Sequence, residues 1–384
     1  MKKIVLVLIL LVAFSSSFLS VNAQESNNID GAISDILSSI NDSDFEDISK
    51  ILNENFNENK SIKEWIVLFL TGEVNLSISI VLRLVKSSFS GVVESVSKIL
   101  IYVIFIGITF GVLNIINYKK SGNNEKNIIY FISYSLVVVL TSQMVSTVFY
   151  STKETIITMS RTIDGCFPIL ITLSDFSGGF GTTFIKPLTG VVSLISSVLC
   201  SEVLLPLLST ALIAVVIGNI STTVKLDSLK KSLLSLVKWI LGIVTVVFSV
   251  VIASQGIVNS QYNGLSFKIL KYATGSIIPI VGGFISGGLD VILSSAVLVK
   301  NSFGLILVFY VLITVLGSGL SILVASFLIK FAVSICEPLL DGSIVKLLSG
   351  IGEVFSYLTA VILVCGFSYV LVCFSIINST ALII

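Results

Sequence analysis

The chain has 384 residues, of which 54% are hydrophobic and 12% are charged, with a formal net charge of +1 and a mean hydropathy of +1.05. Soluble domains carry about twice this fraction of charged residues, so the composition indicates an integral membrane protein. The sequence contains no histidine. This excludes histidine zinc sites, Ser-His and Cys-His nucleophile pairs, and histidine proton relays.

Residues 1–23 have the features of a secretory signal peptide. Lys2 and Lys3 precede an apolar core at residues 4–14, and Ala23 ends a small-residue cleavage site. The alternative is an uncleaved first helix, but the apolar core is short for a membrane span. We therefore expect cleavage and export of the residues that follow.

Residues 24–64 are acidic, with ten carboxylates and three lysines. Their apolar positions repeat at helical spacing and predict two helices, with a capping box formed by Ser43 and Glu46 between them. The two stripes are Ile29, Ile33, Ile36, Leu37 and Ile40, then Phe45, Ile48, Leu52 and Phe56. We expect an extracytoplasmic helical hairpin, which either packs its stripes against its own chain or offers them to a partner.

The next segments approach and cross the membrane. Residues 65–98 are apolar but repeatedly charged, which favours interfacial amphipathic helices. Residues 99–149 are predicted to form a transmembrane hairpin with spans at 99–116 and 128–149. Its linking lysines would be cytoplasmic by the positive-inside rule, in agreement with an exported N-terminus. These lysines are Lys119, Lys120 and Lys126.

The rest of the chain is predicted to be a duplicated core, with repeat 1 at residues 150–257 and repeat 2 at residues 258–384. Each repeat has a Pro/Gly-broken segment, a long apolar stretch, a short amphipathic helix and a final span. These lie at 163–186, 188–220, 221–238 and 239–257, and at 275–300, 303–336, 337–354 and 355–377. Backbone broken at membrane depth has to be buried in protein or line a polar cavity. The residues expected to break the helices are Pro168, Pro279, Gly282, Gly283, Gly287 and Gly288.

Two arrangements of the repeats remain open. The long stretches are either tilted helices or helices broken at Pro206 and at Gly317-Ser318-Gly319. If the broken segments are re-entrant, six spans result and the repeats are parallel; if they cross, each repeat has three spans and the two are inverted. A lysine cluster in the first amphipathic segment favours the parallel arrangement. It comprises Lys225, Lys230, Lys231 and Lys238.

Ionisable residues inside apolar stretches are candidates for a polar pathway, here Glu202, Asp290 and Lys330. Each also has a structural interpretation. Glu202 can pair with a lysine or cap a helix broken at Pro206, Asp290 can cap a helix that begins there, and Lys330 can extend its ammonium to the interface.

No catalytic, cofactor-binding or metal-binding residues are expected. The sequence has no Gly-x-Gly-Asp motif around Asp290, no convincing Ser-Lys pair and no Walker-type glycine loop. The five cysteines lie in apolar stretches without any CxxC, and we interpret them as small hydrophobic residues. We therefore expect a protein that is not an enzyme, needs no cofactor and binds the lipid bilayer but no nucleic acid.

Several runs of residues resemble the stage III sporulation protein AE family. The strongest are residues 270–286 (LKYATGSIIPIVGGFIS) and 299–304 (VKNSFG). Residues 238–242 (KWILG), Gln255-Gly256 and residues 336–342 (CEPLLDG), which contain a Glu-Pro motif, are similar too. The resemblance covers about residues 60 to 384.

The resemblance implies an all-α polytopic membrane protein of endospore formation, located in the mother-cell membrane around the forespore. It implies partners in a multiprotein, secretion-like channel complex that includes a cytoplasmic ATPase. A role as export core and homo-oligomerisation are further expectations. The alternative function is a free-standing secondary transporter that couples to an ion gradient through Glu202 and Asp290.

Overall fold

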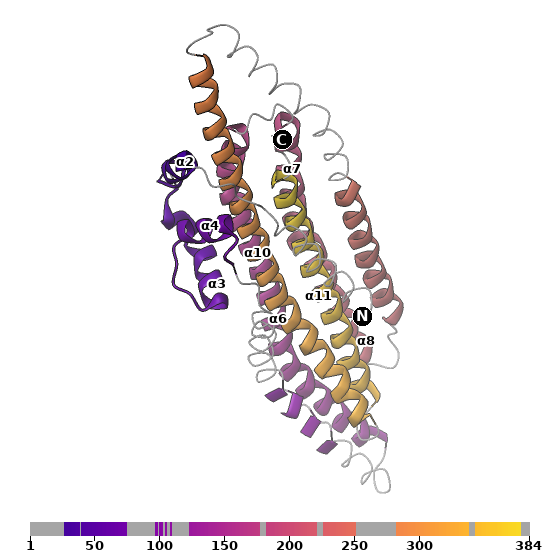
Figure 1. Cartoon of the computed structure of the whole chain (residues 1–384). Coiled ribbons are helices and arrows are strands. Elements are labelled where there is room, and N and C mark those ends of the chain that lie inside the picture. Colours follow the sequence, from indigo (N-terminus) through magenta and orange to yellow (C-terminus); the bar gives the residue numbers. More distant parts are fainter. Residues whose placement is uncertain are drawn as a thin grey trace.

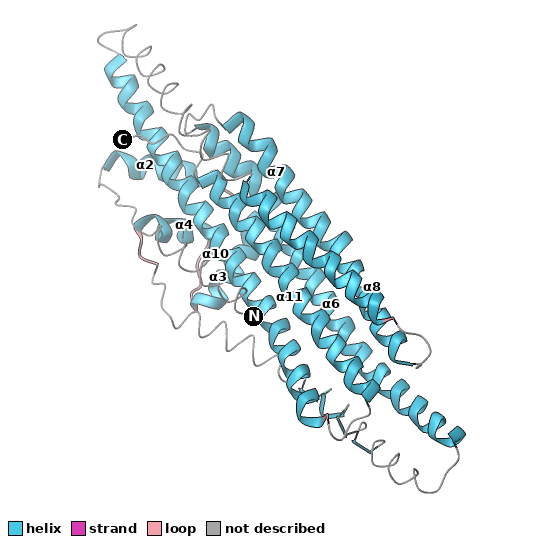
Figure 2. Cartoon of the chain, turned by 90° about the vertical axis from the view of Figure 1, so that its right-hand side faces the viewer, coloured by secondary structure: helices cyan, strands magenta, loops and turns pink. Residues whose placement is uncertain are grey.

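A computed structural model describes residues 27–38, 40–74, 123–176, 182–220, 226–250, 282–337 and 342–377, with isolated positions between 97 and 109. Every regular element in these ranges is helical, which confirms the predicted all-α class. Long helices lie side by side in an elongated bundle, and a group of short helices lies against one flank (Figures 1 and 2). The predicted signal peptide and the predicted span at 99–116 lie outside the described helices.

The short helices form the N-terminal region. They are α2 (Asn27–Ser38), the 3-10 turn η1 (Asp42–Phe45), α3 (Glu46–Phe56) and α4 (Ile62–Thr71). The predicted capping box at Ser43 is wrong, because η1 occupies this position and α3 begins without a side-chain cap. The capping box belongs to α4: Ser61 Oγ accepts from the Glu64 N–H, and Glu64 Oε2 accepts from the Ser61 N–H. Helix α4 therefore crosses the predicted boundary between residues 64 and 65.

The apolar stripes of these short helices pack against the long helix α10 (Gly282–Cys336). Phe45 meets Phe303 edge to face at 5.3 Å, and Phe69 lies 5.3 Å from Phe309. Such aromatic pairs stabilise by about 0.5–1.5 kcal/mol beyond the area they bury. Of the two interpretations of the hairpin, the structure shows the one in which the stripes contact their own chain.

Helix α6 spans Asn123–Phe176 without interruption, so the predicted break at Pro168 is wrong. Proline removes one backbone donor, but a helix held between neighbours tolerates this loss. Thr172 Oγ1 donates to the Pro168 carbonyl and helps to hold the turn. The helix also runs through residue 149, where the transmembrane hairpin was predicted to end.

The other long helices are similarly continuous. Helix α7 (Thr182–Val198), the π-helical turn η2 (Leu199–Leu204) and α8 (Leu205–Ile220) follow one another directly. Helix α10 begins at the first glycine pair, Gly282-Gly283, and runs through Gly287-Gly288, so the break predicted at the second pair is wrong. It also continues through Gly317-Ser318-Gly319, so of the two alternatives for this long stretch the structure shows the continuous helix. Glycine lowers helix propensity by about 1 kcal/mol but does not end a helix that is packed on several sides. Pro279 lies outside the described residues.

Contacts between helices show the direction of each. The Tyr134 hydroxyl donates to the Val216 carbonyl at 2.7 Å, so the start of α6 lies beside the end of α8. Further along, Ser193 of α7 donates to Asp164 of α6 at 2.8 Å. Helices α6 and α7–α8 are therefore antiparallel.

Helices α10 and α11 (Gly342–Ile377) form a second antiparallel pair. Ser326, toward the end of α10, donates to the Gly352 carbonyl near the start of α11 at 2.6 Å. Lys300, toward the start of α10, donates to the Ile376 carbonyl at the end of α11 at 3.0 Å. We call the two ends of the bundle the Lys330 end and the Lys300 end.

The helix Asp227–Val250 starts at the Lys330 end, since Lys230 Nζ lies 2.6 Å from Glu353 Oε2 of α11. Helices α7–α8 and α10 thus run toward the Lys330 end, and Asp227–Val250 and α11 run back. The two hairpins have the same direction, as in a parallel arrangement of repeats and unlike an inverted one. Residues 342–354 of the predicted amphipathic segment and the predicted span at 355–377 form a single helix, α11.

Helix α11 is the centre of the bundle, and none of its described large apolar side chains is exposed. Glycines allow its neighbours to approach closely. A Cβ at Gly366 would overlap Val315 of α10, and one at Gly350 would come within 2.6 Å of Val215 of α8. Five described helices are long and apolar enough to cross a membrane: Tyr134–Ser174, Gly190–Asn219, Asp227–Val250, Ser294–Ile335 and Gly342–Ile377.

Candidate functional site

Glu202 lies in the π-helical turn η2, four residues before Pro206. Because Pro206 has no N–H, it cannot donate to the carbonyl four residues earlier, and the helix widens here. The Leu205 N–H donates to the Cys200 carbonyl, which is the longer π-type spacing. The predicted break at Pro206 is thus a local widening of a continuous helix.

The Glu202 side chain pairs with a lysine, which was one of its two predicted interpretations. Lys153 Nζ of α6 lies 4.0 Å from Glu202 Oε1, and the two side chains are 52% and 63% exposed. An ion pair with this exposure contributes at most about 1 kcal/mol. The geometry is that of a surface pair and gives no support to a buried ion-coupling carboxylate.

Lys330 is exposed near the end of α10, as expected of a lysine that extends toward an interface. Its Nζ donates to Ser356 Oγ of α11 at 2.7 Å. Its aliphatic stem lies over Gly352, where a Cβ would come within 3.1 Å of the lysine Cγ. Lys330 thus joins α10 to α11 at the Lys330 end.

Asp290 lies inside α10, several residues after the first residue of the helix at Gly282. The prediction that Asp290 opens this helix is therefore wrong. Its side chain lies outside the described residues. Forty residues of continuous helix separate Asp290 from Lys330, which corresponds to about 60 Å. The structure does not bring these two candidate pathway residues into one site.

Polar contacts that sequence reasoning missed join α6 to its neighbours. Thr155 shares a hydrogen bond with Ser318 of α10 at 2.9 Å, and Thr162 shares one with Tyr310 at 2.9 Å. Asp164 accepts from Ser193 of α7 at 2.8 Å, and also from Ser160 of its own helix. A regular spacing of small polar residues along residues 155–164 was the available signal.

Among the Asp, Glu, Lys and Arg side chains that the structure describes, Lys300 is the most buried, and it was not selected from the sequence. It is 0% exposed, and its Nζ donates to the carbonyls of Ile376 and Ile377 at 3.0 and 3.3 Å. A cation is favourable at a helix C-terminus, where carbonyls lack intrahelical donors. Gly304, one turn away, leaves room for the Ile377 side chain. The signal was present: Lys300 is the single charged residue between Asp290 and Lys330 in the sequence.

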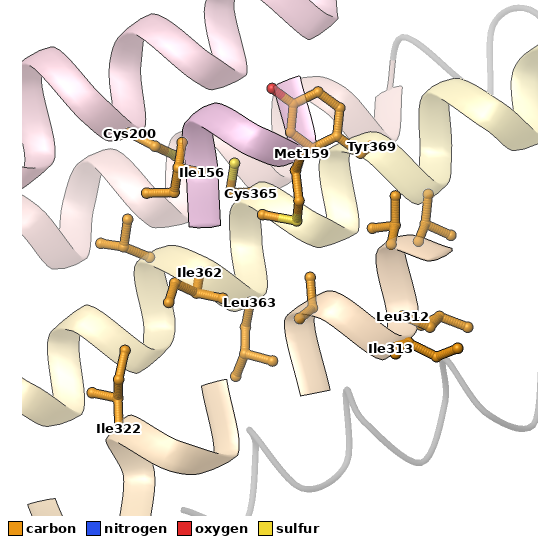
Figure 3. Packing of buried hydrophobic residues seen from close by; sticks show 14 of the residues in the cluster. Ile156, Met159, Cys200, Leu312, Ile313, Ile322, Ile362, Leu363, Cys365 and Tyr369 are labelled. Atoms are coloured by element: carbon orange, nitrogen blue, oxygen red, sulfur yellow. The ribbon is translucent and has the colours of Figure 1, made fainter. Parts of the chain in front are cut away.

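The cysteines that the structure describes lie in the apolar core. Cys166, Cys200, Cys365 and Cys373 are free and buried. Figure 3 shows Cys200 and Cys365 among Ile156, Met159 and Ile362 at the junction of α6, η2 and α11. Within the described ranges, no group of three His, Cys, Asp or Glu side chains could hold a metal ion.

Comparison with known proteins matches most of the chain to one family. The profile of stage III sporulation protein AE matches residues 60–380, which is most of the chain. The chain belongs to this family. It is 23% identical over 313 residues to stage III sporulation protein AE of Bacillus subtilis (strain 168), covering 81% of this chain and 78% of that relative. No solved structure matches the chain.

Two runs that resemble the stage III sporulation protein AE family now have a place in the fold. The run 299–304 lies on α10 where Lys300 holds the end of α11 and where Phe303 meets Phe45. The run 336–342 lies between the end of α10 at Cys336 and the start of α11 at Gly342. The first run thus lies at the junction of the N-terminal helices with the bundle.

Proposed function

We propose that this protein is a non-enzymatic membrane component of a multiprotein, secretion-like sporulation complex that links mother cell and forespore. Membership of the stage III sporulation protein AE family supports a role in sporulation. The role in a complex rests on one structural observation. Aromatic contacts fix the charged N-terminal helices to a helix bundle whose length exceeds the thickness of a bilayer. A further part of the proposal is that the protein forms the export core.

Charge supports a cytoplasmic position for the Lys330 end. The N-terminal helices, which are acidic, lie against α10 toward the Lys300 end. Lysines near the membrane favour the cytoplasmic side, which is consistent with exported N-terminal helices. Those of the Lys330 end are Lys126, Lys230, Lys231, Lys330 and Lys346.

Charge also supports a position for the bilayer along the bundle. Residues 127–152 of α6 contain no charged residue, and at about 39 Å they are long enough for a hydrocarbon core of about 30 Å. Lys153 and Glu202 follow at their outer limit. Beyond it, α6 exposes Arg161 and Asp164. The Lys300 end therefore projects from the membrane on the extracytoplasmic side.

This placement accounts for the length of α10. The helix has 55 residues and is about 82 Å long, which is far more than one crossing requires. The N-terminal helices, α6 and α11 cover the described side chains of its first half, from residue 294 on, and keep the apolar ones from water outside the bilayer. The chain passes from α4, beside this half, to Asn123 at the Lys330 end. With the five described spans, the span predicted from the sequence at residues 99–116 would bring the total to six.

The projecting Lys300 end is a platform on which extracytoplasmic proteins of the complex can bind, and the Lys330 end faces the cytoplasmic ATPase. The N-terminal helices expose carboxylates on this platform, among them Glu46, Asp47 and Glu54. Their apolar side chains are occupied by α10, so polar contacts are the ones left for partners. The transporter alternative gains no support, because Glu202 is engaged with Lys153.

Co-purification of the tagged full-length chain from sporulating cells tests this function. We expect the other membrane proteins of the complex and the ATPase to be recovered in fixed ratios. A variant with Glu46, Asp47 and Glu54 changed to glutamine should lose extracytoplasmic partners and retain the ATPase. Recovery of the chain without any sporulation protein, at normal membrane levels, would contradict the proposal.

A further inference from the structure

An apolar stripe runs along the outer face of α7. Val191, Leu194, Ile195 and Val198 are 48%, 59%, 46% and 55% exposed. Their spacing places them on one face of the helix, opposite to the buried Ser193 and Ser196. We call these four residues the α7 stripe.

Lipid is the ordinary explanation for exposed apolar residues on a membrane protein, but the level of the stripe argues against it. The hydrogen bond from Ser193 to Asp164 places the middle of the stripe beside the part of α6 that exposes Arg161 and Asp164. Thr162, near Asp164 on α6, contacts Tyr310 of α10. Tyr310 follows Phe309, which packs against Phe69, so the N-terminal helices begin to contact α10 at this same height along the bundle. Charged side chains exposed at this level mark an aqueous surrounding.

An apolar stripe in water requires a protein partner, because monomeric surfaces rarely leave such a strip uncovered. The residue types indicate which partner. Val191, Leu194 and Val198 occupy a, d and a positions of a heptad, and β-branched residues at a with leucine at d favour two parallel strands. Two copies of this chain in one membrane present α7 in the same direction, as such a pairing requires.

The charges next to the stripe, on the side of the Lys330 end, also favour a second copy of this chain as the partner. Glu202 follows Val198 by four residues on the same face, and Lys153 lies beside it. In a dimer with a two-fold axis along the stripe, the Lys153–Glu202 pair of one copy lies beside the same pair of the second copy. Opposite charges can then face each other, so the surface is complementary to itself. We propose that the α7 stripe pairs with the α7 stripe of a second copy, outside the bilayer. This inference rests on the membrane placement proposed above.

Cysteine cross-linking tests the pairing in membranes of sporulating cells that express the full-length chain. Leu194→Cys, Val191→Cys and Val198→Cys should each give a disulfide-linked product at about twice 41.2 kDa on mild oxidation. Ile195→Cys, beside the seam, should give several-fold less. Val139→Cys, 67% exposed on the charge-free part of α6, is the matched control and should give none. The unsubstituted chain measures the background from the buried native cysteines.

A second variant does not depend on oxidation. Leu194→Glu should lower the recovery of untagged chain with a tagged copy at least tenfold, with membrane levels unchanged. Three outcomes would overturn the proposal. Labelling of Leu194→Cys by an impermeant maleimide without cross-linking shows an uncovered surface. Cross-linking to another protein shows a different partner. Labelling only by a membrane-soluble maleimide shows lipid, and then the membrane placement fails as well.

Discussion

Lys300 of α10 donates a hydrogen bond to the carbonyl of Ile376 across 3.0 Å, at the last turn of α11. The lysine is completely buried, so its ammonium has lost its hydration, and carbonyls of the helix end replace part of it. The pair joins the C-terminal end of the central helix to the part of α10 that carries the N-terminal helices. The net contribution of Lys300 to stability is therefore the free energy gained from its hydrogen bonds at the helix terminus minus a large desolvation cost.

We expect Lys300→Met to lower the free energy of unfolding by about 1–3 kcal/mol, because carbonyls in a buried place lose a charged donor. Thermal unfolding of the purified protein in detergent measures this. Lys346→Met, at an exposed lysine of α11, is the control and should change it by less than about 0.5 kcal/mol. A Lys300→Met protein as stable as the wild type would show that the desolvation cost outweighs the hydrogen bonds.

Close contact of α10 with α11 predicts opposite effects at two glycines. A Cβ at Gly366 would overlap Val315, so Gly366→Ala should destabilise the protein by about 1–3 kcal/mol. A Cβ at Gly317 meets nothing within 4 Å, so Gly317→Ala should stabilise by about 0.5–1 kcal/mol through helix propensity. Equal effects in thermal unfolding would contradict the close approach of the two helices.

The exposed pair of Lys153 and Glu202 predicts a weak coupling. A double-mutant cycle with Lys153→Met and Glu202→Gln should give an interaction energy of about 0.2–1 kcal/mol. Glu202→Gln alone should leave the spore titre unchanged at normal membrane levels. Loss of sporulation in Glu202→Gln with normal protein levels would instead promote an ion-coupled transporter.

The aromatic contacts of the N-terminal helices predict local detachment. Phe69 is buried against Phe309, and Phe69→Ala should cost about 3–5 kcal/mol, most of it at this contact. Amide hydrogen exchange of α2 to α4 should rise, while that of α11 stays low. Val67→Ala, at a partly exposed position of the same helix, should leave exchange unchanged. Uniform loss of protection across the chain would mean that the N-terminal helices do not unfold separately.

Topology predicts opposite accessibility of two exposed positions. Glu58→Cys lies among the N-terminal helices and should react with an impermeant thiol reagent in intact cells. Lys231→Cys lies at the Lys330 end and should react only after the membrane is permeabilised. Labelling of Lys231→Cys from outside would reverse the proposed orientation.

The sequence predicted the helical class and the apolar stripes of the N-terminal helices, and a lysine pair was one of the interpretations that it left open for Glu202. It failed at Pro168, because neighbouring helices rather than local propensity decide whether a packed helix continues. It failed also at Gly287-Gly288, where glycine weakens a helix without ending it. The contact of Phe45 with Phe303 could not be predicted from the sequence, for a different reason. Periodicity identifies which face of a helix is buried but contains no information on the distant element that buries it.

The unbroken length of α10 has a mechanical consequence. An uninterrupted helix transmits tilt from one end to the other. A rotation of about 5° at Lys330 displaces Gly282, about 72 Å away, by about 6 Å. Phe303 and Phe309 move with this helix, and so do the aromatic rings that lie against them. A force applied at the Lys330 end therefore reaches the N-terminal helices as a lateral displacement, whose size grows with the length of helix between the two points.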